Sequence, residues 1–264
     1  MIELAPNWKR NLTIANPILL AAGGYTTDAV SIGAFATLPT TLRPRAGAPL
    51  PRVGEIPGGI LMRIGAANPG LSHILREYRR AWEQIKIPIV VAFASQGVDD
   101  WATMARQLDS CASGIELQFN STMDVQDAIR VVRSISELPI LAKLDLENAR
   151  AVAADCVQAG ANALVIGRAP RGMKMIEGKE WFGRLHGPAA KPLALKTLAE
   201  IRDTGLEIPL IGCGGIHSVE DAREFLAAGA RAVEIDSAEW IEPGITERIA
   251  TELGGTRTNV DETL

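Results

Sequence analysis

A unit of strand, helix and strand repeats three times along the chain, and this repeat restricts the possible folds more than any other feature. Each copy opens with a proline and a short apolar run, continues with an amphipathic stretch, and closes with small residues and a glycine. The copies begin at Pro88, Pro139 and Pro209, and their helices close at Gly114, Gly160 and Gly229. Proline at the first strand position removes a donor where the ladder has hardly begun, and glycine ends the helix before the next strand.

The strands of these units are continuously apolar, which is typical of a parallel sheet covered on both faces. Two N-terminal runs, Ile18–Ala22 and Ala34–Leu38, bring the predicted strands to eight. Helices are predicted at residues 27–33, 70–85, 99–111, 124–136, 147–158, 190–204, 218–228 and 245–253. Eight strand–helix units in this length predict an α/β protein with a (β/α)8 TIM barrel, formed by residues 1–264 as a single domain. An open doubly wound sheet is the alternative, and it explains the repeat less well.

Composition excludes several other classes of protein. A hydrophobic fraction of 47% and a charged fraction of 22% are those of an ordinary globular chain rather than a disordered one. The net charge of −4 and the absence of a basic block argue against nucleic acid as the main partner. The sequence shows no apolar run of membrane-spanning length and no secretory signal. Three widely separated cysteines form neither a disulfide framework nor a metal site, and we expect a cytoplasmic protein.

Two long segments leave the predicted barrel directly after strands. Residues 43–52 are rich in proline, and residues 170–187 are rich in glycine and lysine. Because the loops that follow barrel strands form the catalytic face of this fold, we expect both segments to lie there.

Lys143 stands near the end of an otherwise apolar strand. A polar side chain inside a barrel is costly unless it binds a ligand or pairs with another group. The position therefore favours a fixed cation for an anionic ligand group. Two alternatives remain, a lysine that extends to the rim of the barrel and a structural ion pair with an inward carboxylate.

Two other strands carry polar side chains at alternate positions. Glu116, Gln118 and Asn120 share one strand face, as do Glu234 and Asp236 on the last strand. The outer face of a barrel strand must bury against helices, so we expect both polar sets to point inward.

The turn Gly212–Ser218 follows a strand and opens a helix. Its glycines let backbone N–H groups approach a phosphate, and this is the usual phosphate position in such barrels. Ser218 and Asp221 predict a capping box at the helix start. The histidines at positions 73, 186 and 217 have no acidic residue spaced to orient them, and none is predicted to act directly in catalysis.

Along almost its entire length the chain resembles the dihydroorotate dehydrogenases, and most of all their class 1 members, which are FMN-dependent (β/α)8 barrels. The similar motifs occur in the family's order, at residues 16–23, 41–52, 64–70, 171–173, 187–192 and 208–221. The last of these is similar to the family's FMN-phosphate strand and helix.

The resemblance implies a flavin site and a substrate site. The FMN contacts that it implies are Ala22, Gly23, Gln118, Lys143, Gly187, Gly214, Gly215 and Ser237. It places Lys143 beside the isoalloxazine ring, where a cation favours the reduced state, and it aligns Ser121 with the catalytic base of the loop. Asn68 and Arg168 are the implied substrate-binding residues for a small acidic molecule. The resemblance also implies a homodimer or a pairing with an electron-transfer subunit.

Several positions depart from the family pattern. Leu38 replaces a lysine, Met62 and Arg168 replace asparagines that bind substrate, Gln118 replaces another asparagine, and Asp236 replaces a glycine beside the phosphate. The loop after Gln118 is also shortened. A like charge beside a phosphate costs about 1 kcal/mol or more unless a cation offsets it.

Three hypotheses follow from the sequence. The first is an FMN-dependent oxidoreductase that converts dihydroorotate to orotate in pyrimidine biosynthesis, or acts on a related substrate. The second is a non-catalytic relative that retains the barrel as a binding or interaction protein. The third is a phosphate-binding lyase or isomerase that works without flavin.

Overall fold

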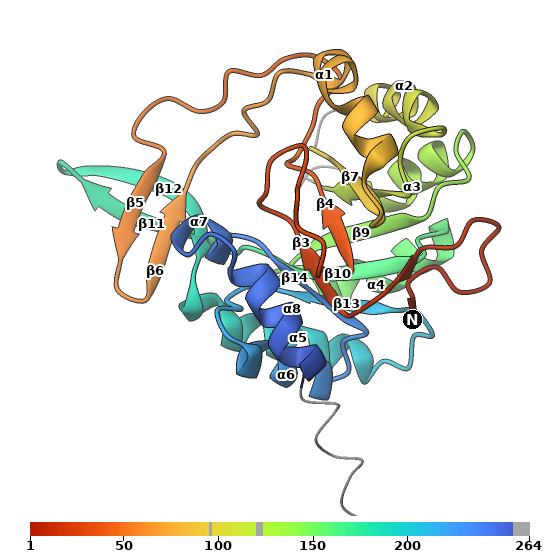
Figure 1. Ribbon diagram of the computed structural model, residues 1–264. Helices are drawn as coiled ribbons and strands as arrows, with labels where there is room; N and C mark the ends of the chain where they lie inside the picture. The colour runs from red at the N-terminus through yellow and green to blue at the C-terminus, as the bar shows by residue number, and fades with distance from the viewer. Residues whose placement is uncertain (95–96, 120–123, 256–264) are drawn as a thin grey trace, which may run out of the picture.

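Eight parallel strands close into a barrel in the computed structural model, which describes residues 1–94, 97–119 and 124–255 (Figure 1). The barrel strands, in spatial order, are β3 (Ile18–Leu20), β4 (Ala34–Ala36), β7 (Ile89–Phe93), β8 (Gly114–Gln118), β9 (Ile140–Asp145), β10 (Ala163–Arg168), β13 (Leu210–Cys213) and β14 (Ala232–Ile235). Pairing of β14 with β3, with Val233 opposite Ile18, closes the ring. The predicted TIM barrel is confirmed.

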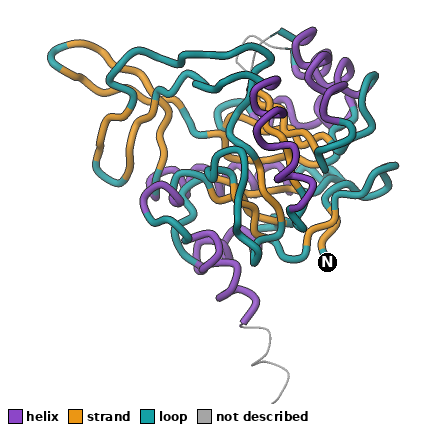
Figure 2. Tube along the Cα trace, turned by 45° about the horizontal axis from the view of Figure 1, so that its top comes forward, coloured by secondary structure: helices purple, strands orange, loops and turns teal. Residues whose placement is uncertain are grey.

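Helices form a layer around the outside of the barrel (Figures 1 and 2). They are α1 (Leu71–Gln84), α2 (Val98–Leu108), α3 (Val125–Arg133), α4 (Ala149–Ala159), α5 (Lys191–Arg202), α6 (Val219–Ala227), α7 (Ala238–Ile241) and α8 (Ile245–Gly255), with a 3-10 turn at Pro188–Ala190. Seven of these follow the sequence prediction within a few residues, whereas the four-residue α7 was not predicted. No helix of the described residues is long and apolar enough to cross a membrane.

The helix predicted at 27–33 is wrong, because that segment is an irregular connection between β3 and β4. Side chains there capture the N–H groups that a helix would use. The hydroxyl of Thr27 accepts a hydrogen bond from the N–H of Ala29, and the carboxylate of Glu247 accepts one from the N–H of Val30. Such local side-chain acceptors compete with helix formation.

Side chains alternate between the barrel interior and the helix layer, as the sequence pattern predicts. On β8, Ile115 and Leu117 pack in the outer core, so Glu116 and Gln118 face inward. The same alternation on β14 turns Val233 and Ile235 outward and Glu234 inward.

The N-terminal segment packs against the apolar part of the barrel interior. A two-stranded ribbon of β1 (Ile2–Glu3) and β2 (Thr13–Ile14) brings fully buried side chains of Leu4 and Leu12 to the inward residues of the barrel. This packing excludes water from the apolar part of the barrel interior, because the apolar side chains there are buried.

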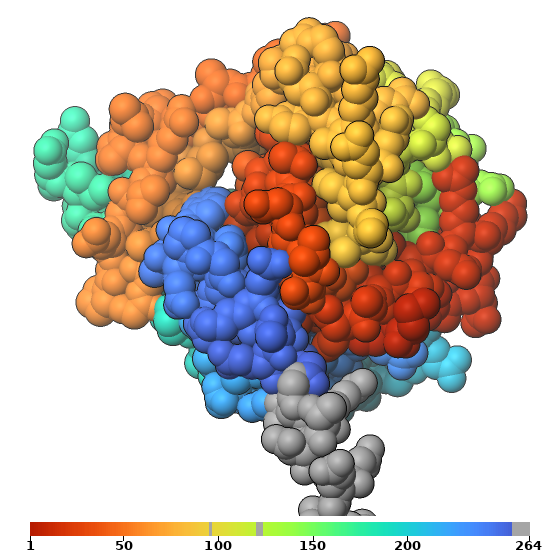
Figure 3. Space-filling model, viewed as in Figure 1, coloured from red at the N-terminus to blue at the C-terminus, as the bar shows by residue number. Residues whose placement is uncertain are grey.

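A four-stranded antiparallel sheet projects from the barrel and is here called the arm (Figures 1 and 2). Its strands are β5 (Val53–Ile56), β6 (Gly59–Met62), β11 (Arg171–Ile176) and β12 (Lys179–His186), in the order β11-β12-β6-β5. The two predicted excursions, 43–52 and 170–187, meet at the end of the barrel where strands terminate, and Trp181 donates a hydrogen bond to the carbonyl oxygen of Pro51. Strands β11 and β12 within the second excursion, and the hairpin of β5 and β6 directly after the first, were not predicted. Figure 3 shows the surface hollowed between the orange strands of the arm and the C-terminal helices in blue.

Candidate active site

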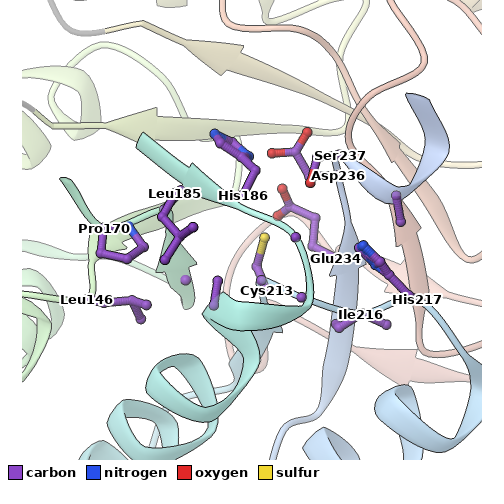
Figure 4. A pocket seen from close by; sticks show the side chains of 17 residues that line it. Leu146, Pro170, Leu185, His186, Cys213, Ile216, His217, Glu234, Asp236 and Ser237 are labelled. Carbon is purple, nitrogen blue, oxygen red and sulfur yellow. The ribbon is translucent and has the colours of Figure 1, made fainter. Parts of the chain in front are cut away.

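A pocket lies where β10, β13 and β14 end, beside the last residues of β12 (Figure 4). Four residues of the predicted cofactor set line it, Gly187, Gly214, Gly215 and Ser237.

The glycine turn after β13 is shaped for an anion. Gly215 has a φ of +71°, and a Cβ atom there would lie 2.6 Å from the backbone nitrogen of Lys191, so the position requires glycine. Within the described residues, the backbone N–H groups of Gly214, Gly215 and Ser237 donate no hydrogen bond. Three free donors beside one pocket form a concave site of the kind that binds phosphate.

Helix α6 begins beside this turn with the predicted cap. The hydroxyl of Ser218 accepts a hydrogen bond from the N–H of Asp221 at 3.1 Å, while the Asp221 carboxylate accepts one from the N–H of His217 at 2.9 Å. The side chain of His217 lines the pocket, and both of its ring nitrogens are buried without a hydrogen-bond partner in the described part of the chain. Burial lowers the pKa of His217 despite the opposing charge of Asp221.

Two carboxylates also face the pocket. Figure 4 shows the side chains of Glu234 and Asp236 pointing into it, with the ring of His186 opposite Asp236. Burial lowers the pKa of His186, although the charge of Asp236 works in the other direction. The pocket thus combines backbone donors suited to an anion with acidic side chains that oppose one.

Lys143, Glu116 and Glu234 form an ion-pair cluster inside the barrel, here called the charged layer. The ammonium of Lys143 contacts the carboxylate of Glu234 and lies 3.5 Å from Oε1 of Glu116. Gln118 donates from Nε2 to Oε1 of Glu116 at 2.8 Å. The structural ion pair that the sequence left open as an alternative is therefore present. Neither Lys143 nor Gln118 lines the pocket described above.

Two guanidinium groups meet one carboxylate at the mouth of the barrel. Asp145 accepts a hydrogen bond from Arg184 at 2.8 Å and lies 3.5 Å from Nη1 of Arg168. Arg168 also donates to the carbonyl oxygen of Phe119. Burial, and then repulsion from Arg184, lower the pKa of Arg168 to about 10, so Arg168 stays charged at neutral pH. Two guanidinium groups share one carboxylate, so the cluster has one cationic side chain in excess.

The remaining predicted residues lie apart from the pocket. The side chain of the buried Asn68 joins two loops, because Oδ1 accepts a hydrogen bond from the N–H of Gly70 at 2.9 Å and Nδ2 donates to the hydroxyl of Thr41 at 2.8 Å. Ala22 and Gly23 follow β3, and the carbonyl of Ala22 accepts a hydrogen bond from Trp240. Ser121 lies outside the described residues.

Comparison with known proteins agrees with this architecture. The family model described as dihydroorotate dehydrogenase matches residues 8–256. The chain belongs to the dihydroorotate dehydrogenase family. Among its relatives, the catalytic subunit of dihydroorotate dehydrogenase B (NAD(+)) of Desulforudis audaxviator is 33% identical, with 92% of this chain and 89% of the relative covered. The subunits of the same name from Geobacillus kaustophilus and Geobacter sp. (strain M21) are 32% and 30% identical, covering 92% of this chain and 87% and 89% of the relatives.

Within the dihydroorotate dehydrogenase family barrel, sequence reasoning missed two residues of the arginine cluster. Arg184 comes from a segment that was interpreted as an excursion without strands. Asp145 is the last residue of β9 and lies two positions after Lys143, so the two side chains share the inward face of the strand. The alternation that placed Lys143 inside the barrel therefore also predicts Asp145 there. No sequence signal indicates that Cys213 and His186 line the pocket.

Proposed function

We propose that this member of the dihydroorotate dehydrogenase family is an FMN-dependent oxidoreductase that acts on a small acidic substrate. The observation that carries the proposal is the set of free N–H donors at Gly214, Gly215 and Ser237, in the place where this family's barrel holds a phosphate. The three donors form a cradle whose turn requires glycine, because a Cβ atom at Gly215 would collide with the backbone nitrogen of Lys191. The cradle therefore suits the phosphate group of FMN, and family membership supplies the redox chemistry.

The other residues of the site divide into those for FMN and those for substrate. Gly187 would close the cradle, while Ala22, Gly23, Gln118 and Lys143 would face the flavin ring by family resemblance. Bound FMN supplies an acceptor for the hydride that leaves the substrate. The protein holds the ring, excludes water and provides a proton acceptor, for which resemblance indicates Ser121.

The arginine cluster favours an acidic substrate. Arg168 and Arg184 share the single carboxylate of Asp145, which leaves one positive charge for a ligand carboxylate. Dihydroorotate, whose oxidation to orotate belongs to pyrimidine biosynthesis, has such a group. We infer that Arg168 takes over binding that the family assigns to an asparagine at this position.

Spectroscopy followed by reduction tests this function. The purified protein, after incubation with FMN and desalting, is expected to retain a flavin absorbance spectrum, and anaerobic dihydroorotate is expected to bleach it. Arg168→Gln should weaken substrate binding with little effect on FMN retention. Retained flavin that dihydroorotate leaves unbleached would overturn the substrate assignment, and a protein that refuses FMN would overturn the cofactor assignment.

A second candidate function is a binding protein that has lost its flavin. The carboxylate of Asp236 at the pocket favours it, because a negative charge there opposes a phosphate. A folded protein that binds no FMN even after Asp236→Asn would support this function over the oxidoreductase.

We also propose that the chain works in an assembly. Its relatives are named catalytic subunits, which implies an electron-transfer partner, and resemblance implies a homodimer. The arm supports a protein contact, because it exposes apolar side chains at Met173, Met175 and Phe182 on one face of the hairpin of β11 and β12, and at Val53 on β5. Met173 lies opposite Phe182, and exposed apolar surface of this kind marks interaction sites.

A further inference from the structure

The charged layer contains one cation and two carboxylates in an almost dry interior. Glu116 and Glu234 are each 1% exposed and Lys143 is 5% exposed. The three side chains come from β8, β9 and β14, and both carboxylates approach the same ammonium. The layer therefore holds two carboxylates for one ammonium group, and rotation of these side chains does not change that ratio.

Charge balance in this layer requires a proton. With both glutamates ionised, the layer would carry one uncompensated negative charge away from water, which is strongly unfavourable. Two carboxylates that share a site do not both ionise in the normal range. One oxygen of each carboxylate, Oε2 of Glu116 and Oε2 of Glu234, is buried without a hydrogen-bond partner among the described residues. An oxygen of this kind is available to carry the proton.

The surroundings favour the proton on Glu234. Gln118 donates a hydrogen bond to Oε1 of Glu116 at 2.8 Å, whereas no side-chain amide of the described residues donates to Glu234. Burial first, and the charge of Glu116 second, raise the pKa of Glu234 to about 8 against the opposing effect of Lys143. Burial disfavours the Lys143 ammonium, but the two carboxylates outweigh it and raise the pKa of Lys143, so the lysine stays charged.

Two further ionisable groups face the layer from neighbouring strands. Cys213 on β13 is buried, and its raised pKa keeps the thiol neutral. Asp236, beyond the end of β14, adds negative charge on the pocket side. His186 on β12 lines the same pocket as Glu234, and burial lowers its pKa and favours the neutral ring. None of these three groups supplies a cation that would ionise Glu234.

We propose that Glu234 is a positioning residue of this site that carries one exchangeable proton. Loss of this proton changes the charged layer beside the pocket from neutral to negative and weakens binding of an anionic ligand. Glu234 is suited to this role because it belongs both to the charged layer and to the pocket lining. The proposal rests on the proposed function in taking FMN as the anionic ligand. The protonation of Glu234 does not depend on FMN, because it follows from the charged layer of the protein alone.

The first test detects the proton in flavin-free protein. Infrared titration between about pH 6.5 and about pH 9.5 is expected to show a carboxylic acid carbonyl band that disappears as pH rises. Glu234→Gln should lack this band, and so should Glu116→Gln, because either change leaves one carboxylate for one lysine. Thermal melting confirms that each variant is folded. A wild-type spectrum without the band, or a band unchanged in Glu234→Gln, would overturn the proposal.

The second test measures the dissociation constant of FMN across the same pH range. The wild-type protein is expected to bind FMN roughly tenfold more weakly at the high end, since one added charge acts on the ligand through a medium of intermediate dielectric constant. Glu234→Gln should abolish this dependence. Asp236→Asn is the matched control, and it should tighten binding at every pH while retaining the dependence.

The two tests separate the possible failures. A protein that binds no FMN at any pH while showing the titrating band would overturn the proposed cofactor but not the proton on Glu234. Equal pH dependence in the wild-type protein and Glu234→Gln would overturn the role of Glu234 in ligand binding.

Discussion

At the scale of single residues, Lys143 acts as the counter-ion of two buried glutamates. Removing one member of a buried ion pair leaves uncompensated charge, which typically costs about 3–5 kcal/mol. We therefore expect Lys143→Ala to lower the free energy of unfolding by that amount in urea titrations. Adding Glu234→Gln to Lys143→Ala should restore part of the loss, whereas additive losses would show that the two side chains are not coupled.

The proton on Glu234 also links stability to pH. Because the pKa of Glu234 is raised in the folded protein to about 8 from an ordinary value of 4.5, the folded state binds more protons than the unfolded state between these values. The free energy of unfolding should therefore fall as pH rises through this window, by roughly 2 kcal/mol or more, and stop falling above it. Chemical denaturation of wild-type protein and Glu234→Gln at several pH values measures the difference. Parallel curves for the two proteins would contradict this linkage.

Strand periodicity predicts which residues point into the barrel, but it does not predict which of these side chains contact one another. It placed Glu116 and Glu234 inside correctly, because the outer face of each strand must be apolar. It could not decide whether Lys143 pairs with them, since that depends on the distance between three strands across the barrel. Asn68 shows the opposite limit, because an amide in a motif looks the same whether it binds substrate or joins two loops.

At the scale of elements, the end of β10 is shaped by a glycine. The pairing of β10 with β9 shifts register between Ile166 and Arg168. Gly167 has a φ of +140°, and a Cβ atom there would lie 1.7 Å from the carbonyl oxygen of Cys213. This irregularity directs Arg168 toward the mouth of the barrel, as bulges beside active sites often do.

We expect Gly167→Ala to destabilise the protein severely, because the clash involves backbone atoms that cannot move without opening β13. Gly178→Ala is the matched control. Gly178 also has a positive φ but no atom within 4 Å of the added Cβ, so its cost should be about 1 kcal/mol. Thermal melting of the two variants compares them, and similar melting temperatures would show that the strand can relax around Gly167.

The elements that the sequence missed are those stabilised by partners distant in the chain. Strands β6 and β12 pair with each other although a large part of the barrel separates them in sequence. Strand β6 has only four residues and β12 is largely polar, so neither has a recognisable pattern by itself. The wrong helix at 27–33 has the same origin, because Glu247 in α8 binds the backbone there.

At the scale of the whole molecule, one face of the arm is apolar and exposed. Met173 and Phe182 are opposite each other on β11 and β12, and they are 48% and 57% exposed. The other face of the arm buries Trp181 at 4% exposure. Neighbouring apolar side chains that stay exposed on one face of a hairpin are typical of a chain with a partner.

We expect Phe182→Asp to weaken self-association at least about tenfold, since aromatic side chains at the centre of an interface contribute most to binding. Analytical ultracentrifugation over a concentration series measures the effect. Leu193→Asp on α5 is the control, because Leu193 is comparably exposed at 46% but lies on the barrel wall. Loss of association in the control as well would place the contact elsewhere or reflect net charge alone.

The pairing of β6 with β12 also sets the order in which the molecule can assemble on the ribosome. The hairpin of β5 and β6 is synthesised early, but its partner strand follows only after half of the barrel has been translated. Until then, one edge of β6 stays open to pairing with other nascent chains. The pocket residues of β12 are translated with that strand, and those of β13 and β14 follow after it. The speed of translation before residue 186, which synonymous codons alter without changing any amino acid, is therefore expected to influence how much of this protein reaches its folded form.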